Sequence, residues 1–445
     1  MPKAMRSIGR GSLLAFAAVM SLAAGAHARN AQDLVLYRFA GGSDAAQPEA
    51  GLIADAAGNL YGTTSAGGGI GCGGSGCGTV FQLSPQQGGG WIETILHTFQ
   101  GGTDGADPDA PLVADADGNL YGSTSLGGSD NCGSGSGCGT VFRLTLRKGA
   151  WTEAVLYSFT TKSRSSRGAN SRGPEIVKPD VWAPNGVAFG NDGNLYGFAS
   201  LGGRCDVMGF LESCYGGAFK LRKPSRSRGA WHESVIYRAR NALASGPEGP
   251  PIFDSSGHLY GLAVSGNYGR VFALQPPSGK GMWTASTLYT FEGGSDGGYP
   301  APGLVFDARG NLYGATAGYR SLAGNVFELT PEQPARWHET PLFTFANATD
   351  GSTPAAAPIL AANGDIYGLT EAGGQNNLGV AYELAAQNGG WSETVLYSFA
   401  GGSDGATPEG SLLAADGTLY GVTLAGGNGG CFDDAGCGTV FAVAP

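Results

Sequence analysis

The pentapeptide Gly58-Asn59-Leu60-Tyr61-Gly62 recurs along the chain and decides its fold. Six further copies lie at residues 118–122, 193–197, 257–261, 310–314, 364–368 and 417–421, and successive tyrosines are 53 to 75 residues apart. Units of this length that bury surface only against their neighbours form one continuous body. The repeat therefore overrides the two or three domains that a length of 445 residues alone would suggest.

Each full repeat contains four strand-like runs. In the first repeat these are residues 51–54, the Leu-Tyr-Gly run of residues 60–64, residues 78–83, and residues 91–99, which open with Trp91 and alternate apolar and polar side chains. Such alternation, with many β-branched and aromatic residues, is typical of strands, and no amphipathic helix is evident beyond residue 28. The sequence predicts four-stranded antiparallel units without helices.

Seven units of four short strands predict an all-β fold, a seven-bladed β-propeller. The small residues of the first run place it innermost, where strands crowd around the axis. We expect the tyrosine ring to fill space between blades, with its hydroxyl at an edge. The glycine after each tyrosine is expected to let the neighbouring blade approach closely.

The two ends of the repeat region predict a closed ring. Residues 34–39 read as a fourth-type strand that lacks its first three partners, whereas residues 438–441 read as a third-type strand that lacks its fourth. The N-terminal strand would therefore complete the last blade. Closure removes the exposed strand edges that an open array would have to cap.

The first 28 residues are typical of a secretory signal peptide. Lys3, Arg6 and Arg10 precede an apolar run at residues 13–24, and Ala26-His27-Ala28 is a small-x-small cleavage site. The run is too short for a membrane span, which needs about 20 apolar residues. We expect a secreted or periplasmic protein with residues 29–445 forming a single propeller, interrupted by a Ser- and Arg-rich insertion at residues 160–180.

Composition limits the partners of the chain. The formal net charge is −10, and it becomes −13 once three basic signal residues are removed. This acidic balance argues against general nucleic-acid binding. Residues 161–240 form a basic sector, which either binds an anionic glycan or is simply exposed to solvent. The second interpretation is preferred, because charge runs are usually solvated.

The eight cysteines form four local pairs at similar places in their repeats. The pairs are Cys72/Cys77, Cys132/Cys138, Cys205/Cys214 and Cys431/Cys437. Zinc binding is the competing interpretation, but the spacings are long and variable for zinc knuckles, and an oxidising compartment favours disulfides. We expect each pair to be linked within its own Gly-rich loop.

The repeat resembles the Gloeo/Verruco (GloVer) tandem repeat of exported bacterial proteins. The resemblance rests on Gly401–Pro408, Gly417–Val422, Gly438–Phe441 and Trp391–Phe399, and related strings extend over residues 33–445. It implies a secreted or surface-attached protein. It implies no common activity.

Five aspartates at equivalent turns are the candidate binding residues of the loop face. They are Asp44, Asp104, Asp296, Asp350 and Asp404. Calcium is one interpretation, although aspartates in different blades are too far apart to share an ion, so each turn would supply its own carbonyls and water. The preferred interpretation is an Asx-turn, which needs Asp for its geometry alone.

Catalysis has little support in the sequence. The four histidines after the signal, His97, His232, His258 and His338, fall in different blades, and no nucleophile motif, metal-ligand spacing or phosphate loop is present. A glutamate recurs in the Trp-x-Glu pattern of the outer strands and is expected to be structural.

The sequence therefore predicts a monomeric, non-enzymatic binding or scaffolding module without a cofactor. Its expected ligand is a glycan or another component of the cell envelope. The alternative is a lyase or hydrolase that acts on polysaccharide or peptide at the axial opening of the ring. Two carboxylates, or a histidine and a carboxylate, converging within hydrogen-bond reach at that opening would favour the enzyme.

Overall fold

The computed structural model describes residues 35–445 apart from short segments. These segments are residues 129–131, 133–135, 161–180, 204, 209–210, 226–228, 240–245, 265–267, 319–323, 333–335, 347–348, 388, 428 and 432–434. The expected signal peptide at residues 1–28 and nearly all of the insertion at residues 160–180 lie outside the described residues.

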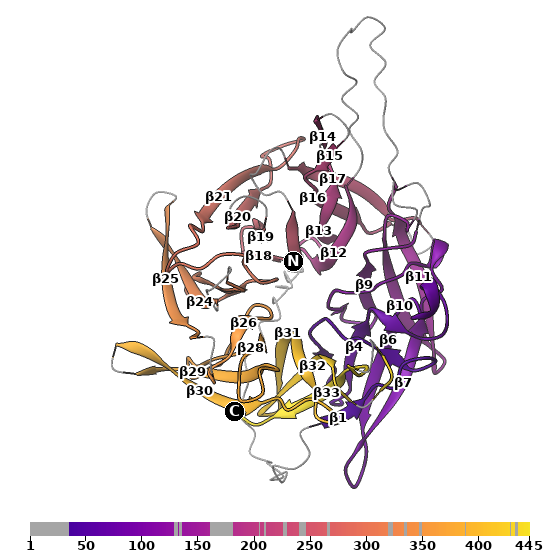
Figure 1. Cartoon of the computed structure of the whole chain (residues 1–445). Helices are drawn as coiled ribbons and strands as arrows, with labels where there is room; N and C mark the ends of the chain where they lie inside the picture. Colours follow the sequence, from indigo (N-terminus) through magenta and orange to yellow (C-terminus); the bar gives the residue numbers. More distant parts are fainter. Residues whose placement is uncertain are drawn as a thin grey trace, which may run out of the picture.

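Seven four-stranded antiparallel blades surround a central axis, as the sequence predicts (Figure 1). The strands of each blade are given from the axis outwards. The first blade consists of β3 (Ile53–Ala54), β4 (Leu60–Thr64), β6 (Thr79–Pro85) and β7 (Trp91–Thr98), and the second blade of β8 (Val113–Ala114), β9 (Leu120–Thr124), β10 (Thr140–Arg147) and β11 (Ala150–Ser158). The third blade consists of β12 (Val181–Phe189), β13 (Leu195–Gly202), β16 (Gly217–Arg222) and β17 (His232–Arg238), and the fourth blade of β18 (Pro247–Phe253), β19 (Leu259–Ala263), β20 (Arg270–Gln275) and β21 (Thr284–Thr290). The fifth blade consists of β22 (Val305–Phe306), β23 (Leu312–Thr316), β24 (Asn325–Glu332) and β25 (Arg336–Thr344). In the sixth blade, β26 (Ser352–Pro354) and β27 (Ile359–Leu360) are innermost, followed by β28 (Ile366–Ala372), β29 (Val380–Gln387) and β30 (Gly390–Ser398). The seventh blade consists of β31 (Ala406–Ala415), β32 (Thr418–Ala425), β33 (Thr439–Val443) and β1 (Val35–Arg38).

The N-terminal strand closes the ring, which confirms the prediction from the two ends of the repeat. β1 pairs antiparallel with β33, with Tyr37 opposite Val440 and Arg38 opposite Thr439. In Figure 1 the indigo start of the ring therefore lies beside its yellow end. Phe39 follows β1 and is fully buried in the cluster that joins the last blade to the first.

The recurring tyrosines pack between blades, as expected. Tyr61 meets Trp151 of the next blade edge-on, with ring centroids 6.3 Å apart, and Tyr420 meets Trp91 in the same way across the ring closure. The Tyr61 hydroxyl donates to Asp55 at 2.9 Å. The tyrosine thus joins neighbouring blades while its hydroxyl fixes the turn before its own strand.

The expectation for the glycine after each tyrosine was wrong in most blades. A Cβ atom on Gly62 would lie 2.6 Å from the Phe81 ring, and one on Gly314 would lie 2.5 Å from the Phe327 ring. Both phenylalanines belong to the third strand of the same blade and stand directly opposite the glycine. The missing side chain therefore makes room for a cross-strand ring of its own blade. Gly261 differs, since its Cβ would meet Phe198 of the preceding blade at 2.3 Å.

A turn before or within the start of each innermost strand connects successive blades. Gln47 and Asp107 have φ angles of 61° and 60°, in the left-handed region that few non-glycine residues occupy. Their backbone N–H groups donate to Cys437 and Cys77 of the preceding blade, at 2.9 and 3.0 Å. These bonds hold the turns in their strained conformation, so that the residues that follow lie near the axis.

Two minor features complete the described structure. The short strands β2 (Ala45–Ala46) and β5 (Ala66–Gly67) pair in a loop, and β14 (Cys205–Met208) pairs with β15 (Leu211–Cys214). The helical elements of the described ranges are the single turns η1 (Cys72–Gly74) and η2 (Gly102–Asp104). None of the helices in this part of the chain is long and apolar enough to cross a membrane.

Candidate functional site

The residue two positions after the left-handed turn residue lines a cavity at the axis in six of the seven repeats. It follows a proline in each blade. These residues are Glu49, Asp109, Asn185, Glu248, Ala301, Ala355 and Glu409. Because the seven innermost strands meet at the axis, closure of the ring gathers side chains that are 50 or more residues apart in sequence. All of them except Ala301 line one cavity.

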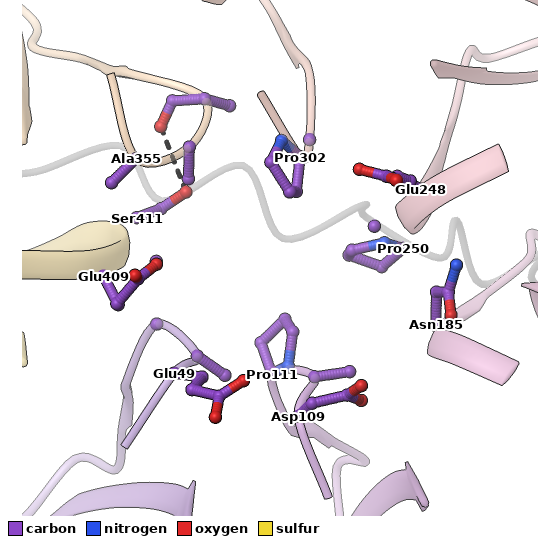
Figure 2. A pocket seen from close by; sticks show the side chains of 18 of the residues that line it. Glu49, Asp109, Pro111, Asn185, Glu248, Pro250, Pro302, Ala355, Glu409 and Ser411 are labelled. Atoms are coloured by element: carbon purple, nitrogen blue, oxygen red, sulfur yellow. Dashed lines mark hydrogen bonds between the residues drawn. The ribbon is translucent and has the colours of Figure 1, made fainter. Parts of the chain in front are cut away.

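This axial pocket has a volume of about 510 Å³ and is lined by segments of all seven blades. Figure 2 shows Glu49 and Asp109 on one side of the pocket and Pro302 across from them. Much of the remaining wall is made of small or apolar residues such as Pro111, Pro250 and Ala355. Three of the pocket's acids, Glu49, Asp109 and Glu409, come from the last, first and second blades, and the fourth, Glu248, lies near Pro250 and Pro302 on the other side.

The carboxyl groups of the pocket resist ionisation. Burial raises the pKa of Asp109 to about 7, and the nearby carboxylates of Asp107 and Glu49 add to the increase. Burial also raises the pKa of Glu409 to about 8, together with the charges of Glu371 and Glu49. Like charges in a confined space favour the protonated form, and so does the loss of water.

The other two acids of the pocket respond in the same direction. Burial raises the pKa of both Glu49 and Glu248. The Ser65 hydroxyl donates to Glu49 at 2.6 Å, which opposes the effect of burial there. No lysine, arginine or histidine is found among the described residues that line the pocket, so none of its own side chains neutralises this charge.

One oxygen of the pocket lacks a partner. Oδ1 of Asp109 is buried, and no group in the described part of the chain forms a hydrogen bond with it. The pocket amide of Asn185, in contrast, donates to the Pro247 carbonyl at 2.7 Å. A buried acceptor without a partner costs about 1–3 kcal/mol, so it marks a place where a ligand donor would be favoured.

Sequence reasoning missed the axial acids, although a signal was present. An acid follows the recurring proline in four of the seven repeats. Each acid alone looks like an ordinary turn residue next to proline. Their convergence is a property of the closed ring, in which the turns from seven blades meet.

The five predicted loop-face aspartates occupy separate turns. Each accepts a hydrogen bond from the backbone N–H four residues earlier, at 2.7 to 2.8 Å: Ala40 to Asp44, Gln100 to Asp104, Glu292 to Asp296, Ala346 to Asp350 and Ala400 to Asp404. Tyr397 also donates to Asp404 at 2.9 Å. These bonds close each turn from an earlier N–H, and they are not those of an Asx-turn, in which the side chain accepts from the N–H two residues later. A binding role for these residues stays a prediction.

The recurring glutamates of the outer strands face these turns from the next blade. Burial raises the pKa of three of them to about 7, with a further increase from the turn aspartate in front of each: Glu93 with Asp44, Glu339 with Asp296 and Glu393 with Asp350. Glu153 is similar, with Asp104 raising its pKa and His97 lowering it. An acidic pair thus lies between blades at several places in the ring.

Three of the four predicted cysteine pairs are disulfides within their own loops. These are Cys72–Cys77, Cys132–Cys138 and Cys431–Cys437. Cys205 and Cys214 stand opposite each other in the backbone of β14 and β15, but their side chains lie outside the described residues. The fourth disulfide therefore stays a prediction.

Two further polar groups have structural partners. His258, which replaces asparagine in the recurring motif, contacts Asp254 through Nδ1 at 2.8 Å. Asn59 makes the corresponding contact with Asp55. Lys220 of the basic sector pairs with Asp192 at 2.6 Å and lies over the Tyr196 ring.

Comparison with solved structures supports the fold. A fungal alcohol oxidase of the AA5 family, solved with copper, is 14% identical with a TM-score of 0.54, covering 92% of this chain and 75% of the oxidase. A polysaccharide lyase is 10% identical with a TM-score of 0.49, covering 92% of this chain and 99% of the lyase. The PQQ-bound aldose sugar dehydrogenase of Streptomyces coelicolor is 12% identical with a TM-score of 0.44, covering 92% and 97%. Of these three, the oxidase alone has a TM-score above 0.5, and at 14% identity its likeness concerns the fold alone.

Comparison at the level of sequence identifies the family. No curated protein matches the chain. The profile of the Gloeobacter/Verrucomicrobia repeat matches residues 26–177 and 323–445, which together exceed half of the sequence. Both matched regions contain the recurring Leu-Tyr-Gly strand and the Trp-initiated outer strand. The chain therefore belongs to the Gloeobacter/Verrucomicrobia repeat family.

Proposed function

We propose that this protein is an exported, monomeric, non-enzymatic binding module of the cell envelope or the space outside it, and that its axial pocket binds a glycan. The observation that carries the proposal is the buried Oδ1 atom of Asp109, which has no hydrogen-bond partner within the described ranges. A ligand hydroxyl or amino group that donates to this oxygen removes the cost of burying it unpaired.

Size and charge narrow the ligand class. A volume of about 510 Å³ falls within the range of small-ligand pockets. Hydroxyl groups donate to carboxylates, and a protonated amino group both donates and neutralises charge. An acidic sugar would add a negative charge to a buried pocket in which Glu49, Asp109 and Glu409 already resist ionisation. We therefore expect amino sugars to bind best, neutral sugars less well and acidic sugars least. The aspartate turns of the loop face are a second proposed contact surface.

A glycan array that includes neutral, acidic and amino-bearing glycans tests the proposal on the mature chain. Loss of one hydrogen bond to a charged group is worth about 1.5–3 kcal/mol, so Asp109→Asn should weaken binding at least about tenfold. Glu332→Gln serves as the control, because this glutamate is exposed on β24. Absence of binding on every glycan class, or equal affinity of the Asp109→Asn variant, would overturn the proposal.

An enzyme acting on polysaccharide or peptide is the second candidate. It is favoured by the pKa values of Asp109, about 7, and Glu409, about 8, because a carboxyl group that holds its proton near neutral pH can act as a general acid. Incubation of array-positive glycans, and of peptides, with the mature chain separates the two candidates. Cleaved products that disappear with Glu409→Gln would replace the binding module by a lyase or hydrolase.

A further inference from the structure

Three potential metal ligands lie close together between the outer strands of the first two blades, and none of them lines the axial pocket. His97 lies in the outer strand β7, Asp104 in the turn η2 that follows it, and Glu153 in the outer strand β11 of the next blade. One ligand atom from each lies within 4.8 Å of the other two. His97 Nε2 is 3.2 Å from Asp104 Oδ1.

We propose that His97, Asp104 and Glu153 bind a divalent transition-metal ion, with Zn²⁺ as the probe. Imidazole and carboxylate together suit such ions, and three protein ligands with one open position are common for zinc. Two ligands at zinc-binding distances are about 3.4 Å apart in a tetrahedral arrangement. The histidine and aspartate atoms are already close to that separation, so Glu153 needs only a modest adjustment.

The surroundings hold these ligands in place. Asp104 uses Oδ2 to accept the Gln100 N–H at 2.8 Å, which leaves Oδ1 facing His97. The His97 ring stands edge-on to Phe99, with centroids 4.7 Å apart. Glu153 contributes a buried Oε1 atom that accepts no hydrogen bond from any described residue. Oriented ligands lose less entropy when an ion binds, and the free oxygen is available to it.

A disulfide supports the turn that carries Asp104. A Cβ atom on Gly101 would lie 3.4 and 3.5 Å from the sulfurs of Cys72 and Cys77, so the disulfide underlies this turn directly. The third ligand comes from another blade. A bound ion would therefore crosslink the first and second blades at their outer edges.

The other repeats act as an internal comparison. The position of His97 is tyrosine at residues 37, 157, 237, 289 and 397 and phenylalanine at residue 343. In the blade of Tyr289, the tyrosine hydroxyl donates to Asp296 at 3.1 Å, with Glu339 close to both. The aspartate–glutamate pair thus recurs as a structural feature. Histidine in one repeat turns that pair into a metal-ligand set.

Zinc binding by the mature chain without a histidine tag tests the proposal. Equilibrium dialysis followed by elemental analysis should give one Zn²⁺ per chain, and Zn²⁺ should raise the melting temperature. His97→Tyr should bind none and lose the thermal shift, while it keeps the melting temperature measured in EDTA, because tyrosine is the native residue in sister repeats. Glu153→Gln should weaken binding at least about tenfold. Unchanged zinc binding by His97→Tyr would overturn the proposal.

The reciprocal change tests the same idea in a separate blade. Tyr289→His places an imidazole beside Asp296 and Glu339, so this variant should bind two Zn²⁺ ions per chain. Combining it with His97→Tyr should return the count to one. A count that does not rise with Tyr289→His would contradict the inference that histidine completes the site.

Discussion

At the scale of single residues, similar acids have different surroundings and hence different properties. Asp44 and its four counterparts accept backbone N–H groups in their own turns. The axial acids face one another across a cavity in which the described lining offers no positive charge. Donors stabilise the charged form of a carboxyl group, whereas burial beside like charge destabilises it. The axial acids are therefore a cost to stability at neutral pH, which is typical of residues kept for binding or catalysis.

The pH dependence of stability reveals this cost at Glu409. Its pKa is about 8 in the folded chain, against an ordinary value of 4.5, so the folded state retains a proton that the unfolded state releases between these values. The proton on Glu409 makes its full contribution to the free energy of unfolding below about pH 4.5, and this contribution declines as the pH rises towards 8. We expect Glu409→Gln to raise the free energy of unfolding by about 2–4 kcal/mol at pH 8 and by little at pH 4.5.

Denaturant unfolding at both pH values measures this effect. Glu332→Gln is the control, because the exposed side chain on β24 should change stability at neither pH. Equal effects of Glu409→Gln at pH 4.5 and pH 8 would show that ionisation of the Glu409 carboxyl group does not lower the stability of the protein.

At the scale of elements, the second and third strands of a blade are matched by size. Gly314 on β23 pairs with Phe327 on β24, and the ring covers the glycine on the same face of the sheet. Phe327 then stacks edge-on with Phe291 of the preceding blade, with centroids 5.2 Å apart. The glycine therefore supports contacts between blades indirectly, through the ring that it accommodates.

Gly314→Ala tests this pairing. The new Cβ would lie 2.5 Å from Phe327 and 3.0 Å from Leu304, so we expect a loss of about 1–3 kcal/mol in the free energy of unfolding from overpacking. Gly279→Ala is the control, since that position has open space and an ordinary φ angle. In a double-mutant cycle, Phe327→Leu should relieve part of the Gly314→Ala cost. Strict additivity would argue against the Phe327 contact.

At the scale of the whole molecule, stability depends on closing the ring between distant parts of the sequence. β1 and β33 are the strands that join the two ends of the repeat region. The same junction contains Phe39, whose ring lies 5.1 Å from Phe81 of the first blade, and the Trp91–Tyr420 contact. A closed ring leaves no blade face uncovered, so each interface supports the others.

Deletion of residues 35–39 should therefore destabilise the protein far more than an ordinary terminal truncation. Loss of one buried phenylalanine alone costs about 3–5 kcal/mol, and the deletion also exposes the edge of β33. The melting temperature, measured by circular dichroism or calorimetry, should fall strongly. Removal of the exposed residues Ala444 and Pro445 is the control. An unchanged melting temperature after the first deletion would contradict the role of β1 in closure.

The fold was predictable because its signals are local and repeated. The Leu-Tyr-Gly run, the Trp-initiated strand and the unpaired strand at residues 34–39 indicate blade number, strand order and closure. The role of the recurring glycine was less predictable, because its spacing reveals a need for room but not which ring occupies it. The axial acids were missed because they lie in different repeats, and the His97 cluster was missed because its third member, Glu153, comes from another repeat than His97.

The sequence by itself determined the seven-bladed ring and three of its local disulfides, because strand periodicity, turn residues and short cysteine spacings act over a few residues. Only the tertiary structure decided that Glu49, Asp109 and Glu409 share one pocket and that Glu153 approaches His97. Those distances depend on how the blades are rotated about a common axis. This rotation results from packing between repeats, and no stretch within a single repeat encodes it.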